Sequence, residues 1–330
     1  MFTEPMLHKN PALIMAFTGI PADDFWFMLE KMEVKFIEYE EERHCRDDRQ
    51  RAVGAGRKFD QSLPKRSVAV LAYLRLHVPQ VVIALMFGLT QCDISRDLRR
   101  LLPLIRVVLP CPEIWDIVEE GQALKDPVSL LSEPLIGGRV LVDATEQRVS
   151  RPSDNETRKL YYSGKKKAFT LKTQLVTDGD HHIVAISTAV PGVMHDKKLS
   201  DEVRTLERLP DGCEIDADKG YQGLMEQVNL VTVRNLKTGA EQQVPRVTVH
   251  TPFKKPKGKE LTEQQEMFNQ QLAAIRVRVE HCIGWAKNWA ILANRFRCAH
   301  SIYTSVMQTV CGLVNEQTRR WQVARLANCA

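Results

Sequence analysis

The spacing of hydrophobic residues changes twice along this chain, and that pattern limits the possible folds more than any other feature. Up to about residue 112, apolar residues recur at helical spacing, as in Phe25 and Leu29. Between residues 140 and 251, short β-type runs alternate with turn residues and one helical stretch. A long helical pattern returns from Thr262. Strands in succession, then helix, strand and helix, are typical of a mixed α/β domain. We therefore expect an all-α N-terminal part followed by an α/β domain.

Prolines and basic residues indicate where these parts join. Residues 1–60 are expected to form a helical segment and a basic, glycine-bearing linker, and residues 61–112 a separate helical domain. Prolines recur around residues 113–136, which we interpret as a linker that contains a short helix from about Trp115 to Leu124. The α/β domain then occupies residues 137–330.

Residues 61–112 show the order of helix, glycine turn and helix that is typical of a helix-turn-helix motif. Gly88 suits the left-handed residue after a helix, and Thr90 can cap the helix that follows. Asp97 argues against the motif because an apolar residue usually stands there, and an ordinary helical hairpin is the alternative. The outer side of the last helix carries polar side chains suited to base edges and phosphates, namely Gln91, Ser95, Arg96, Arg99 and Arg100.

The charge of the chain permits a nucleic-acid partner without requiring one. The formal net charge is +5, and the basic residues gather in runs. Two of these runs would face DNA phosphates, with solvated surface as the alternative; they contain Lys165, Lys166 and Lys167, and Lys254 and Lys255. The longest apolar run is too short to cross a bilayer, and the eight cysteines form no C-x-x-C pair. We therefore expect a cytoplasmic protein with reduced thiols and no membrane partner.

Three acidic residues lie in settings that favour metal-dependent chemistry. Asp143 and Asp218 each end an apolar run that is expected to be a strand, and Glu280 lies on the long C-terminal helix. Clustered carboxylates resist ionisation unless a cation neutralises them. Two Mg²⁺ ions about 3.5–4 Å apart can activate a nucleophile and stabilise the leaving oxygen of a phosphodiester displacement. By spacing alone this triplet is a weak signal, since the chain has 41 Asp and Glu residues.

Short motifs surround these acids and follow one another in order over most of the chain. They include Thr18-Gly-Ile-Pro, Val-Asp143-Ala-Thr-Glu, Tyr161-Tyr-Ser-Gly-Lys-Lys-Lys167, Pro191-Gly-Val-Met-His-Asp196, Asp218-Lys-Gly-Tyr-Gln-Gly223 and Arg276-x-Arg-Val-Glu280. With them, the chain from about Thr18 onward resembles bacterial insertion-sequence DDE transposases and their eukaryotic Harbinger-type relatives. The resemblance implies an RNase H-like catalytic domain, a mixed sheet flanked by helices, at residues 137–330. It implies that an all-α helix-turn-helix domain precedes it.

The resemblance also implies an activity and its cofactor. Asp143, Asp218 and Glu280 would hold Mg²⁺, as two ions, for which Mn²⁺ can substitute. The protein would cleave phosphodiester bonds at terminal inverted repeats and transfer the freed 3′-OH into target DNA. Its partners would be double-stranded DNA and further copies of itself, as a homodimer or larger assembly, and in a bacterium it would associate with the nucleoid.

Two cations match the Tyr-Arg-Glu-Lys signature of related transposases. Arg276 and Lys287 match its Arg and Lys and are expected to grip the DNA backbone. The signature's Tyr position is Ala273 here, which departs from the family pattern.

Some alternatives stay open at this point. Asp196 is the main rival of Asp218 for the second acid, although His195-Asp196 follows a glycine turn rather than a strand. Asp216 is expected to sit below the site, on the same strand face as Asp218. Two other functions also fit the sequence: a helix-turn-helix DNA-binding regulator that has lost recombination, and an RNase H-like nuclease that does not join strands.

Overall fold

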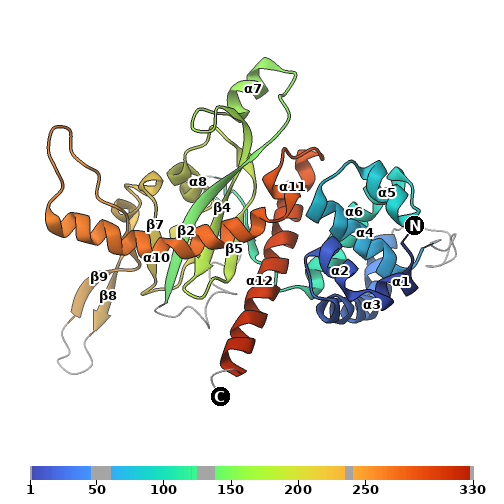
Figure 1. The fold of residues 1–330 in the computed structure, drawn as a ribbon. Coiled ribbons are helices and arrows are strands. Elements are labelled where there is room, and N and C mark those ends of the chain that lie inside the picture. Colours follow the sequence, from blue (N-terminus) through green and yellow to red (C-terminus); the bar gives the residue numbers. More distant parts are fainter. Residues whose placement is uncertain (1, 46–60, 120, 125–137, 235–240, 328–330) are drawn as a thin grey trace. The chain divides into compact units, whose positions relative to one another are not determined.

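The structure is a computed structural model of the 330-residue chain, and it describes all residues except 1, 46–60, 120, 125–137, 235–240 and 328–330 (Figure 1). The chain divides into two compact units. A helical unit contains Met1–Cys111 and Ala286–Ala330, and a sheet unit contains Pro112–Trp285. The functions assigned to the domains in the sequence analysis, DNA binding for residues 61–112 and catalysis for residues 137–330, remain predictions.

The helical unit combines segments from before and after the sheet unit. The sequence analysis placed residues 286–330 with the α/β domain, whereas in the structure they pack with the N-terminal helices. The reason is a set of long-range contacts: Arg106 donates hydrogen bonds to Ser305 Oγ at 3.1 Å and Gln308 Oε1 at 3.0 Å, and Asn315 donates to Pro110 O at 2.9 Å. The α-helices of the unit are α1 (Glu4–Lys9), α2 (Pro11–Thr18), α3 (Ala22–His44), α4 (Leu63–Leu76), α5 (Gln80–Phe87), α6 (Gln91–Val108), α11 (Ala290–Ala293) and α12 (Tyr303–Ala327).

The turn between α5 and α6 is formed by the residues that the sequence indicated. Gly88 has a φ of 60° and ends α5 in the left-handed region. Thr90 caps α6: its side chain accepts from the backbone N–H of Asp93 at 3.2 Å, and Asp93 Oδ2 accepts from Thr90 N at 2.9 Å. Asp97 is buried, and Arg66 of α4 donates to both of its carboxylate oxygens, at 2.9 and 2.5 Å. This ion pair explains how the helix carries an acid where an apolar residue was expected.

The sheet unit contains the predicted mixed sheet. Its strands lie in the order β1-β5-β4-β2-β7-β10, and β3 and β6 pair with β4. The β4 strand is antiparallel to both β2 and β5, whereas β7 runs parallel to both β2 and β10, and β1 runs parallel to β5. The bounds are β1 (Glu113–Trp115), β2 (Arg139–Arg148), β3 (Tyr162–Ser163), β4 (Ala168–Asp178), β5 (Ile183–Ser187), β6 (Val190–Pro191), β7 (Glu214–Ala217) and β10 (Thr248–His250).

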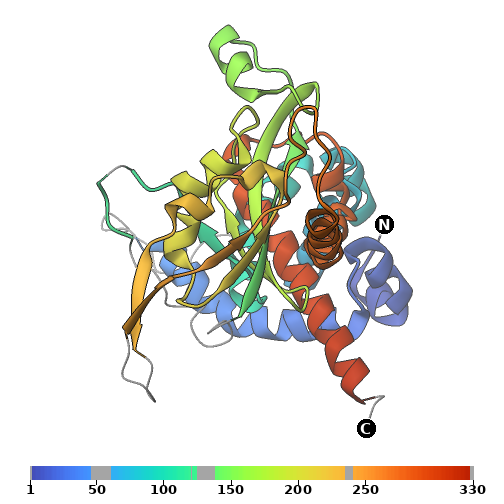
Figure 2. The same ribbon diagram turned by 90° about the vertical axis from the view of Figure 1, so that its left-hand side faces the viewer.

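Different helices contact the two faces of the sheet. On one face, Val142 and Ile215 pack in a hydrophobic core with Leu199 of α8 (Asp196–Glu202) and with Leu209, which follows α9 (Thr205–Arg208). Because side chains alternate along a strand, Asp143 points to the other face. There α10 (Glu263–Lys287) runs across the strands, and the second view shows it nearly end-on (Figures 1 and 2).

Smaller elements extend from this sheet. The strands β8 (Leu230–Arg234) and β9 (Glu241–Pro245) form a separate two-stranded ribbon, and α7 (Asn155–Tyr161) precedes β3. The 3-10 turns η1 (Lys219–Tyr221) and η2 (Met225–Gln227) follow Asp218, and η3 (His300–Ile302) precedes α12.

Three local predictions differ from the structure. Glu113–Trp115 is a strand, and no helix occurs in the described part of residues 115–124; Trp115 is instead buried where β1 pairs with β5. Asp143 does not end its strand, because β4 pairs with β2 as far as Arg148. The single helical stretch expected between the β-type runs is two short helices, α8 and α9, and Arg204 between them has a φ of 53°. The predicted basic linker, residues 51–58, lies outside the described residues.

In the part of the chain that the structure describes, no individual helix combines the length and the apolar composition needed to cross a bilayer. Only α2 and α3 taken together meet that criterion, and they are bent at 76° to each other.

Candidate active site

The register of two parallel strands places Asp143 beside Asp218. Val142 of β2 pairs with Ala217 of β7, and the two aspartates are the next residues along the chain. Side-chain alternation turns both away from the face that carries Val142 and Ala217, toward α10. Two of the three predicted metal ligands therefore meet on the α10 side of the sheet.

Arg276 of α10 lies between these two carboxylates. Its Nη2 is 3.6 Å from Asp143 Oδ2, and its Nη1 is 3.4 Å from Asp218 Oδ1. The side chain of Arg276 is only 10% exposed, so this is a partly desolvated contact in which one cation serves two acids. Such a cation lowers the cost of keeping neighbouring carboxylates ionised.

The two carboxylates differ in their surroundings. Burial raises the pKa of Asp143; the N–H of Ala144, which donates to Oδ1 at 2.7 Å, and the charge of Arg276 oppose the shift, whereas the charges of Asp218 and Asp196 add to it. The side chain of Asp218 is 38% exposed. Asp143 is thus a fixed carboxylate that needs a cation, and Asp218 is open to solvent.

Glu280 is on α10, one turn after Arg276, but its side chain is exposed. The helix directs Leu272, Arg276 and Val279 inward, so Arg276 rather than Glu280 lies beside the aspartate pair. Among the described residues, no group of three or more His, Cys, Asp or Glu side chains lies close enough to hold a metal ion. Asp143 and Asp218 supply the oxygen donors that Mg²⁺ prefers, and the cation already between them shows that the place suits positive charge. The third ligand stays a prediction.

Asp196, the rival for the second acid, belongs to a partly buried ion pair. Lys172 Nζ lies 2.7 Å from Asp196 Oδ1 and 3.8 Å from Glu146 Oε1, and it donates to Met194 O at 2.5 Å. Asp196 also packs on the turn after Asp218, since a Cβ added at Gly220 would lie 2.8 Å from Asp196 Oδ2. These contacts favour a structural role for Asp196.

Lys172 was missed in the sequence analysis. A signal for it exists, because this lysine interrupts the apolar run of β4 directly opposite Glu146 of β2. A lysine at the centre of a buried strand requires an acidic partner.

Asp216 lies two residues before Asp218, on the same face of β7, and is completely buried. Arg139 Nε is 3.4 Å from its Oδ2, and neither carboxylate oxygen has a hydrogen-bond partner in the described structure. Burial raises the pKa of Asp216, while the charges of Arg139 and His250 act in the opposite direction.

The two lysine runs predicted to contact DNA from the sheet unit are exposed, whereas Arg276 is buried. Lys165, Lys166 and Lys167 form the turn between β3 and β4, where Lys167 has a φ of 48°. Lys254 and Lys255 follow β10, and Lys255 pairs with Glu260 at 2.6 Å. At the C-terminal end of α10, Lys287 is half-buried.

The residues predicted to contact DNA from α6 do not all have the same surroundings. Gln91, Arg96 and Arg99 are exposed and Ser95 is half-buried. Arg96 pairs with Asp93 at 3.0 Å. Arg100 is half-buried and lies near Glu40 of α3. Burial acts to raise the pKa of Glu40, but the hydrogen bond and charge of Arg43, with a smaller effect of the charge of Arg100, lower that pKa overall.

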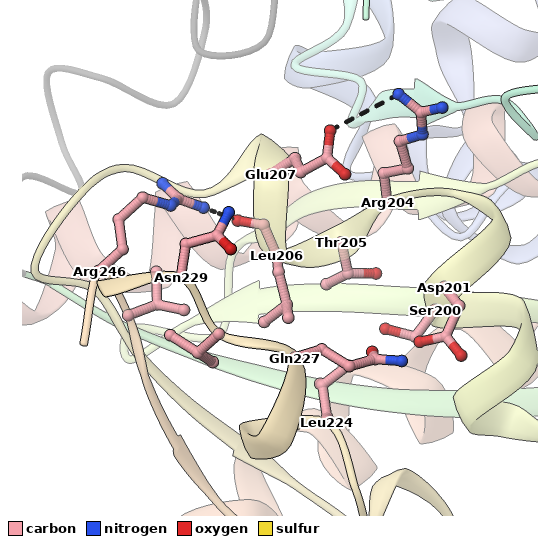
Figure 3. A pocket seen from close by; sticks show the side chains of 12 residues that line it. Ser200, Asp201, Arg204, Thr205, Leu206, Glu207, Leu224, Gln227, Asn229 and Arg246 are labelled. Atoms are coloured by element: carbon pink, nitrogen blue, oxygen red, sulfur yellow. Dashed lines mark hydrogen bonds and ion pairs between the residues drawn. The ribbon is translucent and has the colours of Figure 1, made fainter. Parts of the chain in front are cut away.

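A separate cavity of about 330 Å³ lies on the α8–α9 side of the sheet (Figure 3). Arg246 borders it and donates to Leu209 O at 2.7 Å and to Leu206 O, so the protein itself occupies these donors. Arg204, also in the lining, pairs with Glu207 at 3.6 Å. Because this cavity adjoins the face opposite Asp143, we do not assign it to the site.

Residues 142–315 match the family model described as "DDE superfamily endonuclease", a region that covers more than half of the chain and includes Asp143, Asp218 and Glu280. The chain belongs to the DDE superfamily endonucleases. It is also similar to the "Probable transposase for insertion sequence element IS702" of Microchaete diplosiphon, with 27% identity over 262 residues that cover 79% of this chain and 82% of that protein. The resemblance inferred from the motifs is thereby confirmed. Endonucleases of this superfamily generally depend on divalent metal ions.

Proposed function

We propose that this DDE endonuclease is a DNA transposase. It cleaves phosphodiester bonds at terminal inverted repeats and joins the freed 3′-OH to target DNA. The observation that carries the proposal is the pair Asp143, on β2, and Asp218, directly after the neighbouring β7, which share one cation, Arg276, inside the region that matches the superfamily.

Asp143, Asp218 and Glu280 are the residues that would hold the metal, as two Mg²⁺ ions or Mn²⁺ in their place. When bound, the metal supplies an activated nucleophile and stabilises the leaving oxygen. The N–H of Ala144 fixes Asp143 so that its carboxylate keeps one orientation. Arg276 and Lys287, on the same helix as Glu280, would contact DNA phosphates.

The helices α4, α5 and α6 would form the helix-turn-helix that binds the inverted repeats. Support comes from the left-handed Gly88, the cap at Thr90 and the exposure of Gln91, Arg96 and Arg99. The exposed lysines of the sheet unit would contact the DNA backbone without reading sequence.

The metal ligands are tested with Asp143→Asn, Asp218→Asn and Glu280→Gln. Each variant is expected to lose cleavage of labelled inverted-repeat DNA while it retains DNA binding, because the charge on the metal-binding oxygens is removed and the binding surface is not. Asp196→Asn is the matched control and should keep cleavage at a reduced level. If Asp218→Asn cleaves and a folded Asp196→Asn does not, the second ligand is Asp196.

The fate of the labelled ends separates the three functions. Cleavage followed by joining to a target duplex supports the transposase. Cleavage without joining, under conditions in which the protein is folded and metal is present, supports a nuclease, and binding without cleavage supports a regulator. Two DNA ends must be held together for joining, so light scattering of the DNA complex should give a homodimer or a larger assembly.

A further inference from the structure

The helical unit contains a groove of about 610 Å³ that the sequence did not indicate. Its walls come from three segments: the turn between α4 and α5, the start of α6, and residues 297–302, which follow α11. The last segment was expected to belong to the α/β domain. Its lining includes the polar and charged side chains of Gln80, Gln91, Ser95, Arg99, Arg297 and Ser301.

The groove has the charge of an anion site. Arg99 and Arg297 are both exposed and face it from different segments, and none of the described residues that line it is acidic. In addition, α5 begins at Gln80 and α6 begins at Gln91, so the positive ends of two helix dipoles lie at its edge. An oxyanion is the partner that this combination favours.

The segment that carries Arg297 is attached firmly to α4. Arg297 Nη2 donates to the carbonyl of His77, the left-handed residue that ends α4. The neighbouring Cys298 has its Sγ 3.2 Å from Tyr73 Oη. These two contacts hold Arg297 at the groove next to the exposed side of α6.

We propose that the groove binds a phosphate of the DNA backbone beside α6. This inference rests on the proposed DNA binding by α6. It adds to that DNA-binding surface residues 297–302, which follow the last predicted metal ligand, Glu280, in the sequence. Backbone phosphates are commonly held by arginine and by helix N-termini, and these contacts set the register of a reading helix on the duplex. Residues 297–302 would thus help to place Gln91 and Ser95 against base edges.

The test measures how binding of a labelled random-sequence DNA duplex by the full chain depends on salt. Arg297→Gln should weaken binding and reduce the slope of log K against log salt by about 1, since one phosphate contact is lost. Arg295→Gln is the matched control: Arg295 is exposed two residues before Arg297 but does not line the groove, and its variant should bind as the wild type does.

A gain of charge tests the groove without removing the contact to His77. Gln80→Lys is expected to tighten binding and to steepen the salt slope by about 1. Thermal unfolding of each variant reports whether the helical unit is intact. The inference is overturned if Arg297→Gln binds like Arg295→Gln, or if Gln80→Lys leaves the slope unchanged.

The same data separate this inference from the proposed function. A wild-type chain that binds no DNA overturns both. Normal wild-type binding with no effect of Arg297→Gln overturns the groove alone, and the cleavage assays with the aspartate variants are unaffected by that result.

Discussion

Arg276 shows how one side chain can be identified from sequence while its contacts cannot. Its place four residues before Glu280 marked it as a DNA contact, yet in the structure it bridges Asp143 and Asp218. The contact is loose: both N–O distances exceed those of a well-formed arginine–carboxylate pair, and the buried Nε has no hydrogen-bond partner in the described structure. A guanidinium held in this way can exchange its partners at modest cost.

We predict that Arg276→Gln destabilises the metal-free protein by up to about 3 kcal/mol, because breaking a buried pair leaves carboxylate charge uncompensated. Urea unfolding with and without Mg²⁺ measures this, and the stabilisation by Mg²⁺ should be larger in the variant than in the wild type. Arg278→Gln, an exposed neighbour that donates to Gly179 O at 3.0 Å, is the control and should change little. Equal Mg²⁺ effects in both variants would contradict the idea that Arg276 occupies the place of the metal.

Asp216 gives a prediction about pH. Its folded-state pKa is raised by burial, so its contribution to stability is fully present below the unfolded pKa, near 3.8, and is lost as pH rises through the folded value. Asp216→Asn removes that loss. The variant should be more stable than the wild type at pH 7, and the difference should vanish toward pH 3.8. Urea unfolding across this range decides it, and a variant that is less stable at pH 7 would show that the contact with Arg139 dominates.

At the level of elements, local signals were predicted well and long-range ones were not. Gly88 and Thr90 act within a few residues, so the end of α5 and the start of α6 could be predicted from the sequence. Trp115 fits a helix pattern locally, but pairing of β1 with β5, which lies about seventy residues later, makes it part of a strand. The β8–β9 ribbon was missed because its polar residues, such as Gln242 and Gln243, weaken the alternation that marks a strand.

The site shows the same division. The sequence marked Asp143 and Asp218 as strand-associated acids, and the register of β2 and β7 does bring them together. It could not show that Lys172 engages Asp196, since the two residues are 24 positions apart and lie on different elements. Nor could helical spacing alone show which side of α10 faces the sheet.

Two helical glycines give a matched pair of predictions. A Cβ added at Gly312 of α12 would lie 2.5 Å from Cys111 Sγ and 3.3 Å from its Cα, whereas one at Gly284 of α10 would meet nothing within 4 Å. Gly312→Ala should therefore destabilise the protein by about 1–3 kcal/mol through overpacking. Gly284→Ala should stabilise it by up to about 1 kcal/mol through helix propensity. Thermal unfolding measures both, and a stabilising Gly312→Ala would mean that α12 does not pack on Cys111.

On the scale of the whole molecule, the chain enters the sheet unit after Cys111 and leaves it before Ala286. The core of the helical unit includes Tyr303, Val306 and Val310 of α12, all of them buried. Each such side chain contributes about 1.5–3 kcal/mol when it is buried, so a few of them equal the net stability of a typical domain, about 5–15 kcal/mol.

We therefore predict that a chain ending at Trp285 loses the cooperative unfolding of α4 and α6. Hydrogen exchange should show that their amides are no longer protected. A chain ending at Arg320 is the control, since residues 321–325 are exposed, and it should keep protection. Protected α4 amides in the shorter chain would show that the N-terminal helices suffice for this unit.

The split origin of the helical unit has a consequence for the order of events during protein synthesis. Most proteins complete their N-terminal domain first, as the ribosome proceeds. Under the prediction above, the first helices here are completed only by α12, which is translated after every strand of the sheet. Under the proposed function, an incomplete polypeptide would not bind the terminal inverted repeats and so would not compete there with the finished enzyme. The capacity to recognise DNA would arise together with the capacity to cut it.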